Sequence, residues 1–287
     1  MARSVSADAA RRAGRKAGFV GREAADSRWM RGLARGGLVA RGVNYLLVGS
    51  LAIGIAFGSH QKQADTTGAL RTLSGYPGGI VVLWLLAAGF AGLALWRLAE
   101  TAYGQAGPGG QSGRARLVSL ALGVVYGCVC GIVVDFNLGA SRSSSSDTQS
   151  KTVTARLLAH SGGQVLIAAI GIAFAIAGVA IGVYGIRRRF AAFLRTAQMS
   201  ATARRVVEGL GVAGYLARGV VFCIIGAFLV NAAVSFDPQK AEGLDGSLRK
   251  TADTPLGPWA LLVVALGLVI FGVYSWCEAR WRMVEPG

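Results

Sequence analysis

The chain has 287 residues, of which 53% are apolar and only 15% are charged, whereas an ordinary soluble domain has about 25% charged residues. This balance excludes an ordinary soluble domain and indicates lipid as the solvent. The formal net charge of +16 does not indicate nucleic-acid binding. The basic residues lie between long apolar stretches, which is where membrane proteins carry the charges that set their orientation.

Six apolar stretches are long enough to cross a bilayer, which takes about 20 helical residues. In chain order, we predict membrane helices over Gly37–Phe57, Gly79–Ala99, Leu117–Leu138, Gly162–Ile186, Gly209–Val234 and Gly257–Cys277. The predicted fold class is therefore an all-α membrane protein with six transmembrane helices.

The distribution of lysine and arginine predicts the orientation. The two ends of the chain and the second and fourth connections hold 22 of these residues, and the other connections hold 8, whereas the acidic residues divide evenly. Basic residues are retained on the cytoplasmic side of a membrane. We therefore predict a multi-pass protein of the plasma membrane with both termini in the cytoplasm.

Two basic segments lie outside the apolar stretches. Residues 1–32 are predicted to be a cytoplasmic tail. Residues 190–208 place Phe190, Phe193 and Leu194 on one helical face, with the arginines largely off it. That pattern is typical of a helix that lies in the membrane surface. We predict an interfacial linker helix that binds anionic lipid headgroups.

An internal repeat divides the chain into three two-helix units, at residues 33–105, 114–189 and 209–282. The motif ARGVNY at residues 40–45 opens the first helix, and ARGVVF at residues 217–222 opens the fifth. Later in these two units, a tryptophan or tyrosine precedes a glutamate by four residues. Repeats of this length indicate an architecture built from one recurring structural element.

The middle unit is a weaker copy. Its opening motif, ALGVVY at residues 121–126, has Leu122 in place of the arginine. We align Tyr184 with Trp96 and Tyr274, and Arg188 then stands where a glutamate is expected. Units whose two ends lie on the same side are parallel repeats about an axis along the membrane normal. The predicted packing is a pseudo-threefold bundle of three parallel hairpins.

The repeated ARGV-x-[YF] opening, a later Gly-x-Leu-Arg with proline and a closing Trp/Tyr before Glu resemble the domain of unknown function family 1206. That family consists of bacterial integral membrane proteins with a two-helix domain repeated three times. The resemblance covers residues 33–282 and implies fold and location, but no activity. The mitochondrial carriers also have three two-helix units, but their Pro-x-[Asp/Glu]-x-x-[Lys/Arg] motif does not end the odd helices here.

Four charged residues at membrane depth are candidate ion pairs: Arg41, Glu100, Arg218 and Glu278. A lone arginine deep in hydrocarbon costs at least about 3 kcal/mol, so it needs a partner or a route to water. Each arginine begins one helix of a hairpin, and each glutamate ends the other. We predict pairs within each hairpin, and the alternatives are arginines that extend to the interface or that contact lipid headgroups or a substrate.

Further candidates are polar or small residues within the apolar stretches. Asp135, Asn137, Asn231 and Asn44 form a candidate polar site at membrane depth; the alternatives are interfacial residues and hydrogen bonds between helices. Gly123, Gly127 and Gly131 recur every four residues, and this spacing predicts close helix packing. The sequence has no catalytic motif and no cluster of metal ligands, so we predict neither an enzyme nor a bound metal or cofactor.

Two hypotheses on function remain. The first is a structural or accessory protein that binds lipids or membrane protein partners, because most of the helices lack polar residues near the midplane. The second is a small-molecule or ion transporter that uses the pseudo-threefold axis. A dry axis packed with glycine and leucine favours the first hypothesis. A water-accessible cavity lined by Asp135, Asn231 or Arg41 favours the second.

Overall fold

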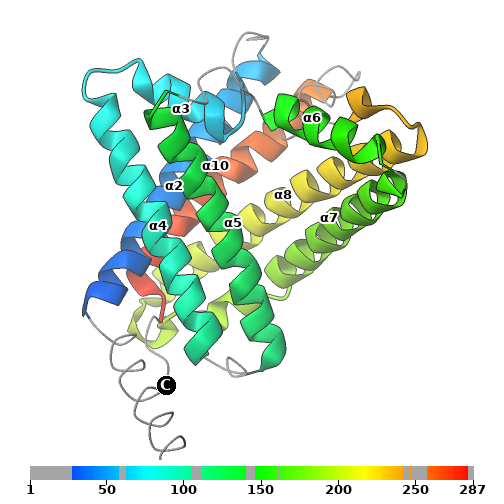
Figure 1. The fold of residues 1–287 in the computed structure, drawn as a ribbon. Coiled ribbons are helices and arrows are strands. Elements are labelled where there is room, and N and C mark those ends of the chain that lie inside the picture. Colours follow the sequence, from blue (N-terminus) through cyan, green and yellow to red (C-terminus); the bar gives the residue numbers. More distant parts are fainter. Residues whose placement is uncertain are drawn as a thin grey trace, which may run out of the picture.

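A computed structural model describes residues 28–57, 63–104, 112–139, 146–160, 162–241, 246, 248 and 257–283. Six long helices form its body (Figure 1): α2 (Arg28–Ala56), α4 (Gly79–Tyr103), α5 (Gly113–Asn137), α7 (Gly163–Ile186), α8 (Ala201–Val234) and α10 (Gly257–Trp281). All six are long and apolar enough to cross a membrane. The prediction of an all-α membrane protein with six spans is confirmed.

The helices α2 and α8 begin much earlier than their apolar stretches. They start at Arg28 and Ala201, because hydropathy detects only the apolar part of a helix, whereas its backbone hydrogen bonds continue. The hydroxyl of Ser200 caps the start of α8 by accepting a hydrogen bond from the amide of Ala203. Arg41 therefore lies about 20 Å along α2, not one turn from its beginning.

Two connections at the end of the bundle opposite the starts of α2 and α8 carry short helices, α3 (Thr66–Ser74) and α6 (Ser146–Leu158). Each is followed by a glycine with a positive φ, Gly78 at 77° and Gly162 at 85°. The next residue is also glycine in both places, because a Cβ there would overlap a backbone carbonyl of the preceding short helix. The Gly-Gly pair therefore marks the same structural position, the start of the second helix, in units 1 and 2.

The six helices form a ring in chain order. Each second helix packs extensively on the first helix of the next unit: α4 on α5, α7 on α8, and α10 back on α2. Contacts within a hairpin are smaller for α2 with α4 and for α8 with α10, and α5 and α7 are almost without mutual contact. This is the cyclic order of a pseudo-threefold bundle, but the ring is open between α5 and α7.

Glycines show that the three interfaces between units share one register. A Cβ added to Gly42 of α2 would lie 2.9 Å from the carbonyl oxygen of Gly272 on α10. A Cβ added to Gly219 of α8 would lie 2.7 Å from that of Gly178 on α7. Gly123, at the same motif position in α5, packs against α4. The repeat thus places equivalent glycines at equivalent helix crossings, and in the α2·α10 and α7·α8 crossings the backbones meet directly.

This register corrects the alignment of Tyr184. Gly178 takes the place of Gly272, and the sixth residue after each is Tyr184 and Glu278, respectively. Counting from the Gly-Gly pairs likewise places Tyr184 at the position of Glu100. The prediction that Tyr184 stands with Trp96 and Tyr274 is wrong by one helical turn. The middle unit has a tyrosine where the other two units have a glutamate.

The predicted glycine ridge of α5 is only partly a packing surface. Gly123 is buried against α4, but Gly127 and Gly131 are exposed, and a Cβ added to either would meet nothing within 4 Å. The buried stripe of α5 continues instead through Tyr126 and Val133. The prediction for Gly127 and Gly131 is wrong, because spacing alone identifies a small face of a helix but not the neighbour that meets it.

The segment 190–208 is not an interfacial helix. It consists of two short 3-10 turns, Arg189–Phe193 and Thr196–Gln198, followed by the first turns of α8. Phe190 and Leu194 are buried in an aromatic core instead of facing lipid. The amide of Arg195 donates to the carbonyl of Trp281 at 2.8 Å, so this linker is attached to the end of α10.

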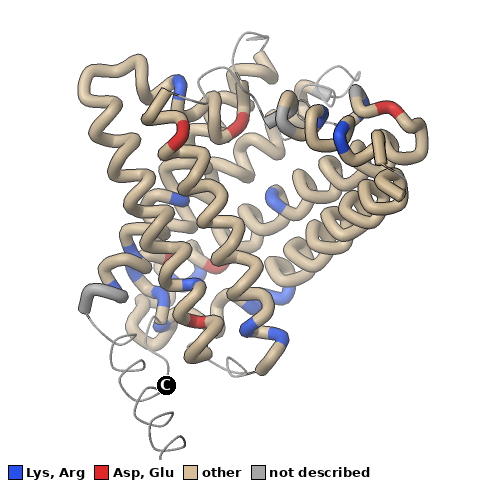
Figure 2. The backbone as a smooth tube through the Cα atoms, in the orientation of Figure 1, with Lys and Arg blue, Asp and Glu red and all other residues tan. Residues whose placement is uncertain are grey.

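Lysine and arginine residues gather at the end of the bundle where α10 ends, here called the basic end (Figure 2). The opposite end carries fewer of them. Most of the predicted basic tail, and residues 140–145 of the third connection, lie outside the described residues.

Candidate functional site

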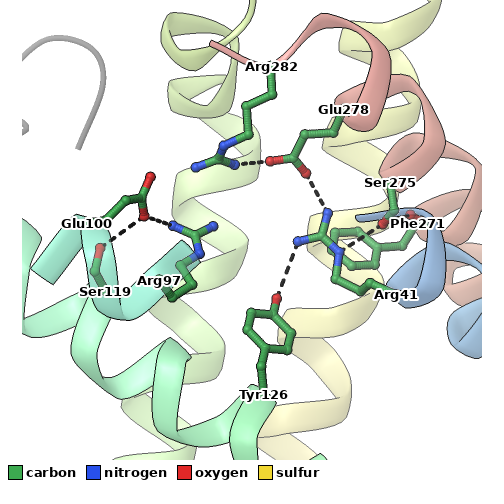
Figure 3. A network of polar contacts seen from close by, with 9 residues as sticks. All are labelled: Arg41, Arg97, Glu100, Ser119, Tyr126, Phe271, Ser275, Glu278 and Arg282. Carbon is green, nitrogen blue, oxygen red and sulfur yellow. Dashed lines mark hydrogen bonds and ion pairs between the residues drawn. The ribbon is translucent and has the colours of Figure 1, made fainter. Parts of the chain in front are cut away.

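The guanidinium of Arg41 is the point where all three units meet (Figure 3). It is buried, and its Nη2 donates to a carboxylate oxygen of Glu278 at 2.5 Å. Its Nε donates to the hydroxyl of Ser275 at 3.1 Å, and its Nη1 to that of Tyr126 at 3.4 Å. Arg41 lies on α2, Tyr126 on α5, and the other two residues on α10. The contact therefore joins the ring across its interior.

Glu278 has a second cationic partner. Arg282, one turn further along the chain, donates to its other carboxylate oxygen, and both side chains are buried. Burial disfavours a charged guanidinium, but the carboxylate of Glu278 outweighs this and raises the pKa of Arg282 above its ordinary value. One carboxylate is thus shared by two arginines, from α2 and from the end of α10.

Glu100 does not pair with Arg41, and that prediction is wrong. Its carboxylate accepts hydrogen bonds from Nη1 of Arg97 at 2.7 Å and from the hydroxyl of Ser119 on α5 at 3.3 Å (Figure 3). Arg97 lies three residues earlier on the same helix. Arg97 is one of the basic residues counted for the orientation of the chain, and in the structure it is the buried counter-charge of Glu100.

Arg218 does not pair with Glu278, so the second predicted ion pair is also wrong. Its guanidinium lies over three aromatic rings, at 5.8 Å from Tyr45, 5.5 Å from Phe222 and 5.4 Å from Phe271. Its Nε is buried without a hydrogen-bond partner among the described residues. Phe271 also lies 5.2 Å from the guanidinium of Arg41. Such cation–π contacts contribute about 2 kcal/mol or more when desolvated.

The shared register explains why the pairs form between units. The arginine of each unit stands opposite the glutamate position of the unit that packs on it. Arg41 and Glu278 fill both positions of the α2·α10 interface. In the α4·α5 interface, Glu100 stands opposite Leu122, and the hydroxyl of Ser119, one turn before Leu122, takes the place of the arginine.

The α7·α8 interface is the reverse case. Arg218 stands opposite the position where the repeat has a glutamate, but Tyr184 occupies that position. The ring of Tyr184 instead packs edge-on against that of Tyr215, with centroids 5.2 Å apart. The middle unit lacks both charges, and this breaks two different interfaces. In one, the carboxylate of Glu100 pairs with Arg97 of its own helix instead of an arginine across the interface. In the other, the guanidinium of Arg218 has no carboxylate partner among the described residues.

The described cluster carries an excess of positive charge. Four guanidinium groups face two carboxylates, which gives a net charge of +2: Arg41, Arg97, Arg218 and Arg282 against Glu100 and Glu278. An uncompensated charge in a low-dielectric interior is costly. The arrangement is suited to holding an anion.

The four predicted polar residues do not form one site. Asp135 and Asn231 are exposed, and the amide oxygen of Asn231 accepts a hydrogen bond from Ser235, the residue directly after α8. Asn44 is half-buried, and the amide nitrogen and oxygen of Asn137 are buried without a hydrogen-bond partner. No hydrogen bond joins any two of these four side chains.

Most of the residues that hold the charged cluster in place were not predicted from the sequence. Tyr126 had a signal, because it is the aromatic residue that closes the repeated ARGV-x-[YF] motif. Ser119, Ser275 and Arg282 had no signal in the repeat, because their role depends on which helices are neighbours.

The sequence matches a known protein family. The sequence profile described as Domain of Unknown Function (DUF1206) matches residues 36–104, 117–188 and 213–282. The chain belongs to this family. The three matches to DUF1206 coincide with the three units of the ring. The resemblance inferred from the repeated motifs is confirmed.

One curated relative extends the comparison. The chain is similar to the uncharacterized protein YxxB of Bacillus subtilis (strain 168), with 30% identity over 249 residues, which cover 86% of this chain and 89% of that protein. No solved structure matches this DUF1206 chain.

Proposed function

We propose that the chain is a non-catalytic accessory protein of the plasma membrane that binds anionic lipid, with both termini in the cytoplasm. The orientation is supported by the basic residues that gather at one end of the bundle (Figure 2), because lysine and arginine are retained on the cytoplasmic side.

The observation that carries the proposal is the open side of the ring between α5 and α7. In the apolar core of α2, α4 and α10, half of the residues are buried, but only 22% in α5 and 17% in α7. Large aliphatic side chains on these two helices are exposed, among them Leu120, Val124, Val125, Ile170, Ile172 and Ile176. A bilayer fills such a side with lipid chains.

Arginines flank this open side at the basic end. Arg114 lies in the first turn of α5, and Arg187, Arg188 and Arg189 directly follow α7; all four are exposed. Each basic residue near an anionic membrane surface contributes about 1 kcal/mol of attraction. The geometry therefore suits lipids whose chains enter the open side and whose headgroups carry negative charge.

The alternative is a small-molecule or ion transporter along the pseudo-threefold axis. It draws support from the ring order of the helices and from the inward direction of Arg41 and Arg218. Two observations favour the accessory role. Arg41 is buried under contacts from the other two units, and the polar residues Asp135 and Asn231 face outward.

The test is native mass spectrometry of the protein extracted together with its surrounding membrane. The wild type is expected to retain anionic phospholipid above its share in that membrane. Replacing Arg187, Arg188 and Arg189 by glutamine should remove this enrichment, whereas Arg71→Gln at the opposite end should preserve it. Bound lipid with the bulk composition in all three proteins would contradict the proposal. A solute flux in proteoliposomes that depends on Arg41 would favour the transporter.

A further inference from the structure

We propose that Arg218 is the centre of an internal binding site for one phosphate-type oxyanion. The site comprises Arg218, Tyr45, Phe222 and Phe271 and lies inside the ring, beside the Arg41–Glu278 pair. The oxyanion is a lipid headgroup phosphate or free phosphate. If the oxyanion is a lipid headgroup phosphate, the inference rests on the proposed function. The evidence for the site itself consists of independent observations.

The first observation is the balance of partners. Arg41 and Arg282 share Glu278, and Arg97 has Glu100. Arg218 alone of these four arginines has no carboxylate among the described residues. Its buried Nε has no hydrogen-bond partner, which is also true of the Nε of Arg97 and of Arg282. Aromatic rings stabilise a guanidinium, but they leave its in-plane N–H donors unused. Those donors require an acceptor that the described protein does not supply.

The second observation is the repeat itself. At the α2·α10 interface, the register places a carboxylate beside the equivalent arginine, Arg41. At the α7·α8 interface, the same register holds Tyr184, which packs on Tyr215 instead. The α7·α8 interface therefore has no negative charge at the position where the α2·α10 interface has Glu278. An external anion completes the pair that the other interface makes internally.

The third observation is access. Arg218 points into the ring, because it contacts Tyr45 on α2 and Phe271 on α10. The side chains of Arg218, Tyr45 and Phe222 are only half-buried, whereas that of Arg41 is fully buried. Arg218 and its two half-buried neighbours are therefore partly accessible from outside the protein, and the ring that holds them is open between α5 and α7.

The chemistry of the site selects the class of ligand. A planar guanidinium presents paired N–H donors that match two oxygens of a phosphate. The aromatic rings around Arg218 form apolar walls. The helix α7 adds no second positive charge to the site. A singly charged phosphodiester, or one phosphate ion, suits this single free guanidinium.

The experiment measures the apparent melting temperature of the full chain in neutral detergent with three probes. These are inorganic phosphate, dioctanoyl phosphatidylglycerol and dioctanoyl phosphatidylcholine. The wild type should be stabilised by phosphate, by phosphatidylglycerol, or by both, with phosphatidylcholine at least about tenfold weaker. A response to phosphatidylglycerol alone identifies a lipid headgroup, and a response to inorganic phosphate identifies a soluble anion.

Three variants locate the site. Arg218→Gln should weaken the response at least about tenfold, and Arg280→Gln, which removes an exposed arginine of α10, should leave it unchanged. Tyr184→Glu supplies the missing carboxylate, so it should raise the melting temperature without probe and abolish the response. Equal responses of the wild type and Arg218→Gln would overturn the site. An equal response to phosphatidylcholine would overturn it too, whereas the anionic-lipid proposal fails only if the extracted protein retains no excess of anionic phospholipid.

Discussion

The α2·α10 and α7·α8 interfaces have the same architecture with different chemistry. In both, a glycine on the opening helix of one unit (α2 or α8) lies against a backbone carbonyl on the closing helix of the neighbouring unit (α10 or α7). The positions are equivalent in the repeat. The α2·α10 interface contains the Arg41–Glu278 ion pair, whereas the α7·α8 interface, the most extensive in the molecule, contains the Tyr184–Tyr215 ring contact. Close glycine packing therefore determines how the helices cross, and the ion pair is not needed for it.

Substitution of Glu278 is the strongest test of the difference between the two interfaces. In Glu278→Gln, two buried guanidiniums lose the only carboxylate that pairs with them in the described part of the chain. We expect the free energy of unfolding to fall by about 3–5 kcal/mol. Glu208→Gln is the matched control, because Glu208 pairs with two exposed arginines, Arg204 in the first turns of α8 and Arg188 just after α7. Its cost should stay below about 1 kcal/mol. Similar losses in denaturant titrations of both variants would show that the buried pair has no special weight.

The glycines test whether packing is shared by the two interfaces. An added methyl group in Gly219→Ala would lie 2.7 Å from a carbonyl oxygen of α7, and in Gly42→Ala 2.9 Å from one of α10. We expect each variant to lose about 1–3 kcal/mol of unfolding free energy. If Gly42→Ala is neutral while Gly219→Ala is not, the ion pair rather than the glycine holds α2 on α10.

A double-mutant cycle tests the pairing between units. Arg41→Leu and Glu278→Gln should show a coupling energy of about 1–3 kcal/mol, because the two groups are in direct contact. Arg41→Leu and Glu100→Gln should add within about 0.5 kcal/mol. The measurement is the unfolding free energy of the single and double variants. Coupling of Arg41 to Glu100, rather than to Glu278, would restore pairing within the hairpin.

The smallest effect is expected at the open side of the ring. Gly127→Leu should change the apparent melting temperature little, because a side chain at Gly127 meets no neighbour and lipid tails are as apolar as leucine. Gly123→Leu is the matched control on the same helix, and it should destabilise, since a Cβ at Gly123 already lies 3.1 Å from Leu98. A large loss in Gly127→Leu would mean that α5 has a further packing partner.

Part of the charged cluster could be predicted and part could not. The repeat correctly marked Arg41, Glu100, Arg218 and Glu278 as special, because they recur in register with the helix-opening motifs. It led to the wrong pairs because a hairpin suggests that its own two helices are the closest neighbours. In this ring, the second helix packs mainly on the next unit, and no spacing within a unit reveals that choice.

The sequence by itself determined the number of membrane helices, the three units and the positions of their glycines. These follow from local properties, because hydropathy, helix length and repeated motifs are read along the chain. Only the tertiary structure decided which arginine meets which glutamate, that Tyr184 replaces a glutamate, and that the ring is open between α5 and α7. The physical reason is that charge pairing and closure depend on which helix faces lie against each other. Residues distant in the chain determine that choice.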